Sequence, residues 1–320
     1  MTVNFALLGT GRIAEDQLAP AIAEVEGAEL WSVLSRDEAR ALSLARRHGA
    51  RAPNPAFTDL ESLLADSALH GVIIATPDKM HADQAVAAAR AGKHVFTEKP
   101  MAASVAEAER MIEAADRGAV KLGVAYHMRW HAGHRRLARA VREGLIGEIR
   151  HARIQWSFHA ADASNWRAAT EFGRWWGLAG VGTHCIDQLR WILRPRCGEV
   201  VEQKSLISRS VWEGPHDETA VLSFRFASGA TAELCSSVLF DAPKRFEIYG
   251  SGGYAVCEDT LGPDGKGRIW THAGEFPFQP ENPYAGEIRD FTEAIVQGRA
   301  PEVPGEEGLE NIKHMLAAIS

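Results

Sequence analysis

The chain has 320 residues, a length that accommodates two domains, each with its own hydrophobic core. Hydrophobic residues make up 46% of the chain and charged residues 24%, which excludes a mainly disordered protein. The net charge is -7 and no long run of Lys or Arg occurs, so we expect no binding to nucleic acid or to an anionic membrane surface.

The cysteines and the apolar segments indicate a cellular compartment. None of the 4 cysteines has the C-x-x-C spacing of a metal or redox motif. The N-terminal residues run directly into a strand pattern without a basic region, and no segment approaches the ~18 apolar residues of a membrane span. We therefore expect a cytoplasmic protein with reduced thiols, no metal site and no membrane contact.

The first part of the chain alternates short apolar runs with helical patterns. The expected strands are 3–8, 29–34, 71–75, 94–97 and 120–125, and the expected helices are 13–25, 37–48, 59–64, 78–91 and 104–117. This alternation is typical of a parallel sheet whose strands are connected by helices that cover both faces. The sequence therefore predicts an α/β Rossmann domain, with a doubly wound parallel sheet, over residues 1–122.

The second part follows a different pattern. Runs rich in Val, Phe, Ile and Thr are separated by glycines, as expected for antiparallel strands joined by tight turns; they are 147–158, 219–226, 230–239 and 245–249. Helical patterns cover 133–143, 183–193, 285–297 and 306–319. Residues 123–320 are therefore predicted to form an α+β domain with an open, mostly antiparallel sheet. Because one face of such a sheet needs cover, we expect a homodimer or homotetramer joined through it.

A glycine-rich turn follows the first predicted strand. Gly9-Thr10-Gly11-Arg12-Ile13-Ala14 has the form G-x-G-x-x-A and opens a predicted helix. The glycines permit a tight turn and a close approach of the backbone to a pyrophosphate, which the helix N-terminus attracts. A plain strand–helix turn is the alternative, but the β-α-β context favours dinucleotide binding.

The end of the second predicted strand bears on the choice of cofactor. NAD enzymes usually have an acidic residue there for the ribose 2′-hydroxyl, whereas this chain has Ser35-Arg36. A hydroxyl and a guanidinium suit a 2′-phosphate, so NADP(H) is the preferred cofactor and NAD(H) the alternative. A solvated Arg36, with Asp37 capping the next helix, would explain the same residues structurally.

Two further loops follow buried strands and should lie at the carboxyl edge of the sheet, where ligands bind. The first holds Thr76-Pro77, with His81 one turn into the next helix, where it has either a structural or a functional role. The second is Glu98-Lys99-Pro100. Lys99 could reach the nicotinamide ribose and a substrate hydroxyl, and a cis peptide before Pro100 would aim it. A surface Lys–Glu pair is the alternative interpretation of this loop.

These motifs together resemble a known family. The Gly9–Ala14 turn, Ala75-Thr76-Pro77, Ala91-Gly92-Lys93-His94-Val95 and Glu98-Lys99-Pro100 follow the order and spacing of the Gfo/Idh/MocA (glucose–fructose oxidoreductase and inositol dehydrogenase) family. Trp166-Arg167, Gly182-Thr183-His184 and the segments 247–253 and 287–291 extend the resemblance over nearly the whole chain.

The resemblance implies hydride transfer between nicotinamide C4 and a carbinol or carbonyl carbon of a sugar, inositol or related polyol. It implies that Lys99 polarises the reacting oxygen or moves its proton, and that His184 is an acid or base. The implied cofactor contacts are Gly9, Thr10, Gly11, Arg12, Ile13, Ser35, Arg36, Thr76, Pro77, His81, Glu98 and Lys99. The expected substrate contacts are Lys99, Tyr126, His127, Arg129, Trp166, Arg167 and His184.

One position departs from the family pattern. Gly180 stands where the family usually has Asp in the segment that contains His184 and Asp187. Alternatives to the sugar or polyol dehydrogenase stay open, and this departure supports the last of them. They are a dihydrodiol-type enzyme, an enzyme that cleaves glycosides through transient oxidation, and a non-catalytic NAD(P)-binding sensor.

Overall fold

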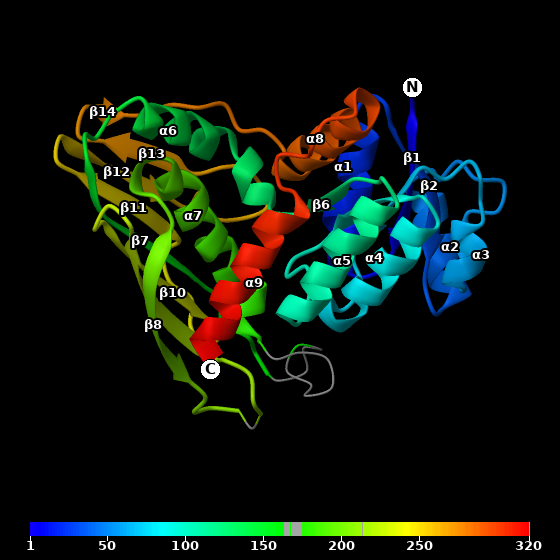
Figure 1. Ribbon diagram of the computed structural model, residues 1–320, viewed down its shortest axis with the longest axis horizontal. Coiled ribbons are helices and arrows are strands. Elements are labelled where there is room, and N and C mark those ends of the chain that lie inside the picture. The colour runs from blue at the N-terminus through cyan, green and yellow to red at the C-terminus, as the bar shows by residue number, and fades with distance from the viewer. Residues whose placement is uncertain (163–166, 168–174, 213, 320) are drawn as a thin grey trace. The chain divides into compact units, whose positions relative to one another are not determined.

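The computed structural model describes residues 1–162, 167, 175–212 and 214–319 of the chain. The chain folds into two compact units, whose elements are labelled in Figure 1. The first unit comprises Met1–Tyr126 and Tyr284–Ile312, and the second comprises His127–Pro283 and Lys313–Ser320. The chain therefore returns to the first unit after it has formed most of the second.

The first unit is built on a six-stranded parallel sheet in the order β3-β2-β1-β4-β5-β6. Its strands are β1 (Val3–Leu8), β2 (Ala28–Leu34), β3 (Ala56–Phe57), β4 (Gly71–Ile74), β5 (His94–Thr97) and β6 (Leu122–Val124). All residues of β4 are buried, as expected for an inner strand of a sheet that is covered on both faces. The predicted doubly wound parallel sheet is confirmed.

Helices cover both faces of this sheet. They are α1 (Ala19–Glu24), α2 (Glu38–Arg47), α3 (Leu60–Leu64), α4 (His81–Arg90), α5 (Val105–Arg117) and α8 (Pro283–Gln297), with a π-helical turn over Ala14–Leu18 before α1. Figure 1 shows α4 and α5 packed side by side. Side chains of α1 and α8 share one hydrophobic core with β1 and β2. Side-chain oxygens of Asp37, Asp59 and Ser104 cap α2, α3 and α5 by accepting backbone N–H groups of their first turns.

Aromatic packing holds α8 against the sheet. The Phe291 ring lies 6.1 Å from the ring of Phe5 on β1 and 5.0 Å from that of Phe96 on β5, measured between centroids. On β6, a Cβ atom at Gly123 would lie 2.8 Å from Phe96 and 2.9 Å from Phe291, so the rings leave room for glycine alone. This packing fixes which face of α8 points toward β5.

The second unit contains an eight-stranded sheet in the order β14-β13-β12-β11-β7-β10-β9-β8. Its strands are β7 (Ile149–Ser157), β8 (Val200–Ser208), β9 (Thr219–Phe226), β10 (Thr231–Ser237), β11 (Arg245–Gly250), β12 (Gly253–Glu258), β13 (Arg268–Thr271) and β14 (Gly274–Glu275). Neighbouring strands are antiparallel except β7 and β10, which pair in parallel. The predicted mostly antiparallel sheet is confirmed.

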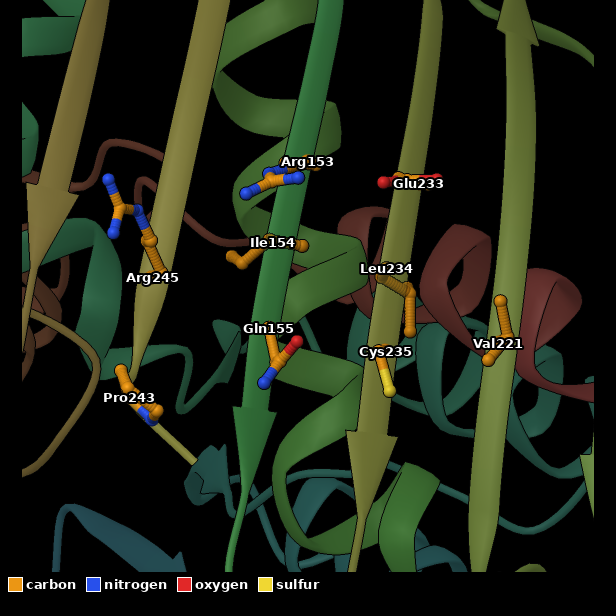
Figure 2. A pocket seen from close by; sticks show the side chains of 9 residues that line it. All are labelled: Arg153, Ile154, Gln155, Val221, Glu233, Leu234, Cys235, Pro243 and Arg245. Atoms are coloured by element: carbon orange, nitrogen blue, oxygen red, sulfur yellow. The ribbon is translucent and has the colours of Figure 1, made fainter. Parts of the chain in front are cut away.

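The two faces of this sheet differ in character. On β11, Phe246 and Ile248 are buried, whereas Arg245 and Tyr249 are exposed on the opposite face. The apolar face packs against α7 (Thr183–Cys197), which lies beside α6 (Ala132–Arg142). The C-terminal turns of α9 (Gly305–Ile319) join the same unit through hydrogen bonds to β8. The other face, seen in Figure 2, carries the polar and partly exposed side chains.

Two further features concern the cysteines and the helices. All four cysteines are free thiols. In the part of the chain that the structure describes, no helix combines the length and the apolarity needed to cross a membrane.

Candidate functional site

The turn after β1 has the geometry of a phosphate-binding loop. Gly9 has a φ of 106°, and a Cβ atom there would lie 2.6 Å from the backbone oxygen of Ala75. A Cβ on Gly11 would meet no atom within 4 Å, so the backbone at Gly11 faces open space. The helix that follows directs free N–H groups and the positive end of its dipole toward the turn. These residues fit a dinucleotide pyrophosphate.

The end of β2 lies against this turn. The hydroxyl oxygens of Thr10 and Ser35 are 3.3 Å apart, and the guanidinium of Arg40 donates to the backbone oxygen of Thr10 at 3.0 Å. The carboxylate of Asp37 accepts the backbone N–H of Arg40 at 3.2 Å and so acts as the cap of α2. The acidic residue closest to the end of β2 is therefore already used in capping.

The structure brings together the predicted residues of the turn after β1 and of the end of β2. Gly9, Thr10, Gly11, Arg12 and Ile13 form the turn, and Ser35 and Arg36 follow β2, with both arginine side chains exposed. Arg40 was missed by the sequence analysis. Its signal is its place in the first turn of a helix capped by Asp37, from which a long side chain can reach back to the glycine turn.

His81 connects the loops that follow β4 and β5. Its ring is fully buried, with Nε2 2.8 Å from the backbone oxygen of Thr76 and Nδ1 2.9 Å from that of Pro100. The Thr76 hydroxyl donates to Oε1 of Gln84 at 2.7 Å. These bonds fix the Thr76-Pro77 loop and the Lys99-Pro100 loop relative to each other, which favours a positioning role for His81.

The Glu98-Lys99-Pro100 loop leaves the carboxyl end of β5. The peptide bond between Lys99 and Pro100 is cis. The backbone N–H of Lys99 donates to Oε2 of Glu98 at 3.2 Å, and the Glu98 side chain is buried. Because β5, β4 and β1 are parallel neighbours, Lys99 lies on the same edge of the sheet as the glycine turn.

Two titratable residues of α8 extend this cluster and were not predicted as site residues. Glu287 is fully buried, and burial raises its pKa well above the ordinary carboxyl value; the negative charge of Glu98 raises it further, and the positive charge of Lys99 lowers it. Burial also raises the pKa of Tyr284 well above its usual range, with added contributions from Glu98 and Glu287. The titratable groups near Lys99 therefore come from the loop after β5 and from α8 together.

In the second unit, His184 lies in the first turn of α7 within an aromatic cluster. Its ring stacks on Trp156 at a centroid distance of 5.4 Å and meets the ring of His127 edge-on at 4.7 Å. The ammonium of Lys244 lies 5.8 Å from the Trp156 ring centroid, a cation–π distance. The predicted residues His127 and His184 are thus neighbours, and Trp156 and Lys244 join them.

Arg129 and Asp187 form a buried ion pair one turn further along α7. Nε and Nη2 of Arg129 donate to the two carboxylate oxygens of Asp187 at 2.9 and 2.6 Å. The side chains are 3% and 0% exposed. A bidentate pair of this kind holds both groups in place, which favours a structural role for Arg129 over its expected contact with substrate.

Gly180 lies one turn before His184, beside an aromatic ring. A Cβ atom there would lie 3.6 Å from Cε1 of Phe158, which is ordinary van der Waals contact. The position therefore has room for a small side chain, and glycine is not required by crowding. Both positions have an aromatic neighbour, since Phe158 lies beside Gly180 and Trp156 stacks on His184.

The remaining expected substrate residues have different environments. Tyr126 is fully buried at the end of the first segment of the first unit, and Arg167 is partly buried. Trp166 lies outside the described residues. The adjacent Trp175 and Trp176 are buried within the second unit, where the Trp176 ring packs 4.9 Å from that of Trp212.

The comparisons with known proteins agree with this arrangement. Residues 3–126 match the family model described as "Oxidoreductase family, NAD-binding Rossmann fold", and residues 134–256 match the "GFO/IDH/MocA C-terminal domain". The chain therefore belongs to the Gfo/Idh/MocA oxidoreductase family, whose Rossmann domain binds NAD(P). The resemblance inferred from the sequence motifs is confirmed.

Individual relatives include enzymes of sugar and inositol chemistry. The chain is 29% identical to a 1,5-anhydro-D-fructose reductase of Ensifer adhaerens, over 99% of this chain and 95% of the reductase. It is 25% identical to a myo-inositol 2-dehydrogenase of Thermotoga maritima, over 96% and 92% of the two chains. A solved aldose-aldose oxidoreductase from Caulobacter crescentus has the same fold, with a TM-score of 0.92 at 24% identity over 99% and 96% of the chains.

The Arg129–Asp187 pair gives a stability prediction. Asp187→Ala leaves a buried guanidinium without its carboxylate, so we expect the free energy of unfolding to fall by about 3–5 kcal/mol. Urea denaturation followed by circular dichroism measures this change. Glu199→Ala is the control, because it removes an exposed partner of Arg194 on the same helix, 3.7 Å away, and should cost less than about 1 kcal/mol. Equal losses in the two variants would contradict a stabilising pair.

Proposed function

We propose that the protein transfers hydride between nicotinamide C4 and a carbinol or carbonyl carbon of a sugar, inositol or related polyol. The observation that carries this proposal is the shared sheet edge: the glycine turn after β1 and Lys99 after β5 are separated by β4 alone. A dinucleotide held by that turn can extend along the edge toward Lys99. The names of the reductase and dehydrogenase relatives support the substrate class.

Two side chains carry the acid–base chemistry in this proposal. The nicotinamide supplies or accepts the hydride, while the Lys99 ammonium polarises the substrate oxygen and exchanges a proton with it. His184 is the second acid–base group, because an imidazole changes its protonation near neutral pH. Trp156 and His127 hold the His184 ring from two directions, which fixes the direction of its nitrogens.

These roles predict large losses of turnover. Lys99→Met and His184→Ala should each lower kcat by roughly 100- to 10,000-fold, the usual contribution of a positioned acid or base. NADPH affinity should change little in His184→Ala, as measured by fluorescence titration. Lys266→Met and His272→Ala replace exposed residues of the same types and should retain wild-type kcat. Near-normal turnover in His184→Ala would make His184 structural, and Tyr126 or His127 would become the next candidate.

The corner at the end of β2 supports a preference for NADP(H) over NAD(H). Arg12, Arg36 and Arg40 bring three guanidinium groups to the turn and to the start of α2, and Ser35 adds a hydroxyl. Guanidinium groups bind phosphate through paired donors, whereas a ribose hydroxyl favours a carboxylate acceptor. Asp37 is engaged as a helix cap, which weakens the case for NAD(H).

The cofactor preference can be measured directly by titration. Arg36→Ala and Arg40→Ala should each weaken NADPH binding by about 1.5–3 kcal/mol, because a charge-assisted contact to phosphate is lost, while NADH binding changes less. Arg46→Ala removes an exposed arginine from the last turn of the same helix and should leave both affinities unchanged. Equal losses for both cofactors, or no preference in the wild type, would reject the 2′-phosphate role.

The rival functions differ in how they use the cofactor. A sugar or polyol dehydrogenase consumes one cofactor for each product molecule. An enzyme that cleaves glycosides by transient oxidation forms product without net consumption, and a sensor binds cofactor without turnover. A panel of aldoses, inositols, 1,5-anhydro-D-fructose, dihydrodiols and glycosides, assayed with both cofactors, separates these functions. Gly180 supports the sensor, whereas the retained Lys99 and His184 oppose it.

The outer face of the second sheet supports a homo-oligomer, and the free thiols of all four cysteines support our proposal of a cytoplasmic enzyme. The cross-strand register places its exposed large apolar side chains on the same face: Leu206, Val221, Tyr249, Tyr254 and Trp270. Between them lies a carboxylate, Glu247, that binds Arg153, Arg245 and the hydroxyl of Tyr249. Figure 2 shows Arg153, Arg245 and Val221 along this face. A neutralised, partly apolar sheet face is suited to a second copy of the chain.

We therefore expect a homodimer or homotetramer joined through this face. Val221→Glu together with Tyr254→Lys adds charges to the face and should shift the molecular mass in light scattering toward the monomer at micromolar concentration. Glu109→Lys on α5 is an exposed control in the first unit and should leave the mass unchanged. A monomeric wild type would refute the oligomer, and an unchanged oligomer in the double variant would refute this interface.

A further inference from the structure

Glu287 is an unusual residue of the first unit because its carboxyl group is fully buried. Its side chain is fully buried, and within the described residues neither carboxyl oxygen has a hydrogen-bond partner. An ionised carboxylate in such a place would lack both solvent and hydrogen-bond donors, which disfavours the charged form. Burial and the nearby Glu98 raise the pKa of Glu287, in agreement with a neutral acid.

The fold places this buried carboxyl near the lysine of the candidate site. Phe291 packs on Phe96 of β5, and Glu287 lies one turn before Phe291 on the same face of α8. Lys99 lies three residues after Phe96, just past the end of β5. The charges of Glu98 and Lys99 act on Glu287 directly, and Tyr284 lies one turn before it.

We propose that Glu287 is a positioning residue for Lys99: it stays uncharged at neutral pH, adds no second negative charge beside Lys99, and by ionising raises the pH at which Lys99 gives up its proton. The proposal rests on the proposed function of Lys99. Glu287 acts on Lys99 through its charge. While Glu287 is neutral, Lys99 can release its proton to a substrate oxygen; once Glu287 is ionised, a second carboxylate beside Glu98 holds that proton more tightly.

The direction of the shift in the kcat–pH profile can be derived for alcohol oxidation, in which Lys99 must first lose a proton. The rate then rises with pH as the amine forms. In the wild type, ionisation of Glu287 moves this rise to higher pH. Glu287→Gln keeps the shape and stays neutral, so the rise in kcat should move to lower pH. The dissociation constant of NADP⁺ and the KM for the alcohol should change less than about threefold, because Gln preserves the packing.

A stability measurement tests the protonation state without turnover. A carboxyl whose pKa is raised on folding contributes stability that is present below its unfolded pKa and is lost as pH rises toward its folded pKa. Over that window the folded-to-unfolded ratio of the wild type should fall by up to about tenfold per pH unit relative to Glu287→Gln. Glu293→Gln, on the exposed side of the same helix, should show no such drift apart from its surface pair with Arg299.

The experiment therefore combines kcat–pH profiles, denaturation at several pH values, and carbon NMR of ¹³C-carboxyl-labelled glutamate in the wild-type protein. We expect one glutamate carboxyl that remains protonated near pH 7, a kcat profile shifted to lower pH in Glu287→Gln, and an unshifted profile in Glu293→Gln. An unshifted profile in Glu287→Gln, or a wild type without a protonated glutamate carboxyl, would overturn the proposal.

Failure of the proposed function gives a different result. If Lys99→Met retains full turnover, Lys99 is not the proton carrier and the positioning role falls with it, although the NMR signal of a protonated Glu287 remains. If Glu287→Gln does not fold, the NMR titration of the wild type alone decides whether the residue is neutral. A carboxyl that ionises near the ordinary glutamate value would then reject the proposal.

Discussion

The first unit depends on the parallel register of β1, β4 and β5, which places three loops at one edge of the sheet. The loops after β1 and β4 are brought together by the contact between Gly9 and the backbone of Ala75, where a Cβ atom would lie 2.6 Å from the carbonyl oxygen. A side chain at Gly9 would push β1 and β4 apart at their carboxyl ends. The glycine turn, the Thr76 loop and the Lys99 loop therefore meet only because this approach is possible, and His81 then ties the latter two together.

The chemistry of this edge depends on how charge is balanced in a buried place. Two carboxyls, Glu98 and Glu287, lie near one ammonium, and burial makes it costly to ionise both. In the second unit, the buried charge of Asp187 is balanced by Arg129, which donates two hydrogen bonds to it. The His184 ring nearby is held by aromatic rings. Near His184, the charge of Asp187 is balanced by an ion pair. Near Lys99, we infer that the second carboxyl stays protonated.

Much of this could be predicted from the sequence because the signals are local. The apolar runs, the Gly9–Ala14 turn and the loop at Lys99 are read from neighbouring residues, and the family motifs gave the order of the two domains. The role of α8 could not be read in this way. Its place on the first sheet depends on Phe291 meeting Phe5 and Phe96, residues far away in the sequence. Arg40 was missed for the same reason, since only the folded turn brings Thr10 within its reach.

We propose that the protein moves hydride between the nicotinamide and a sugar or polyol carbon. The most direct measurement uses NADPH deuterated at C4 on the transferred face, a carbonyl substrate from the sugar and inositol series, and mass spectrometry of the product. We expect one deuterium on the new carbinol carbon and one cofactor oxidised for each product molecule. Product without deuterium, or product formed without net oxidation of the cofactor, would contradict it.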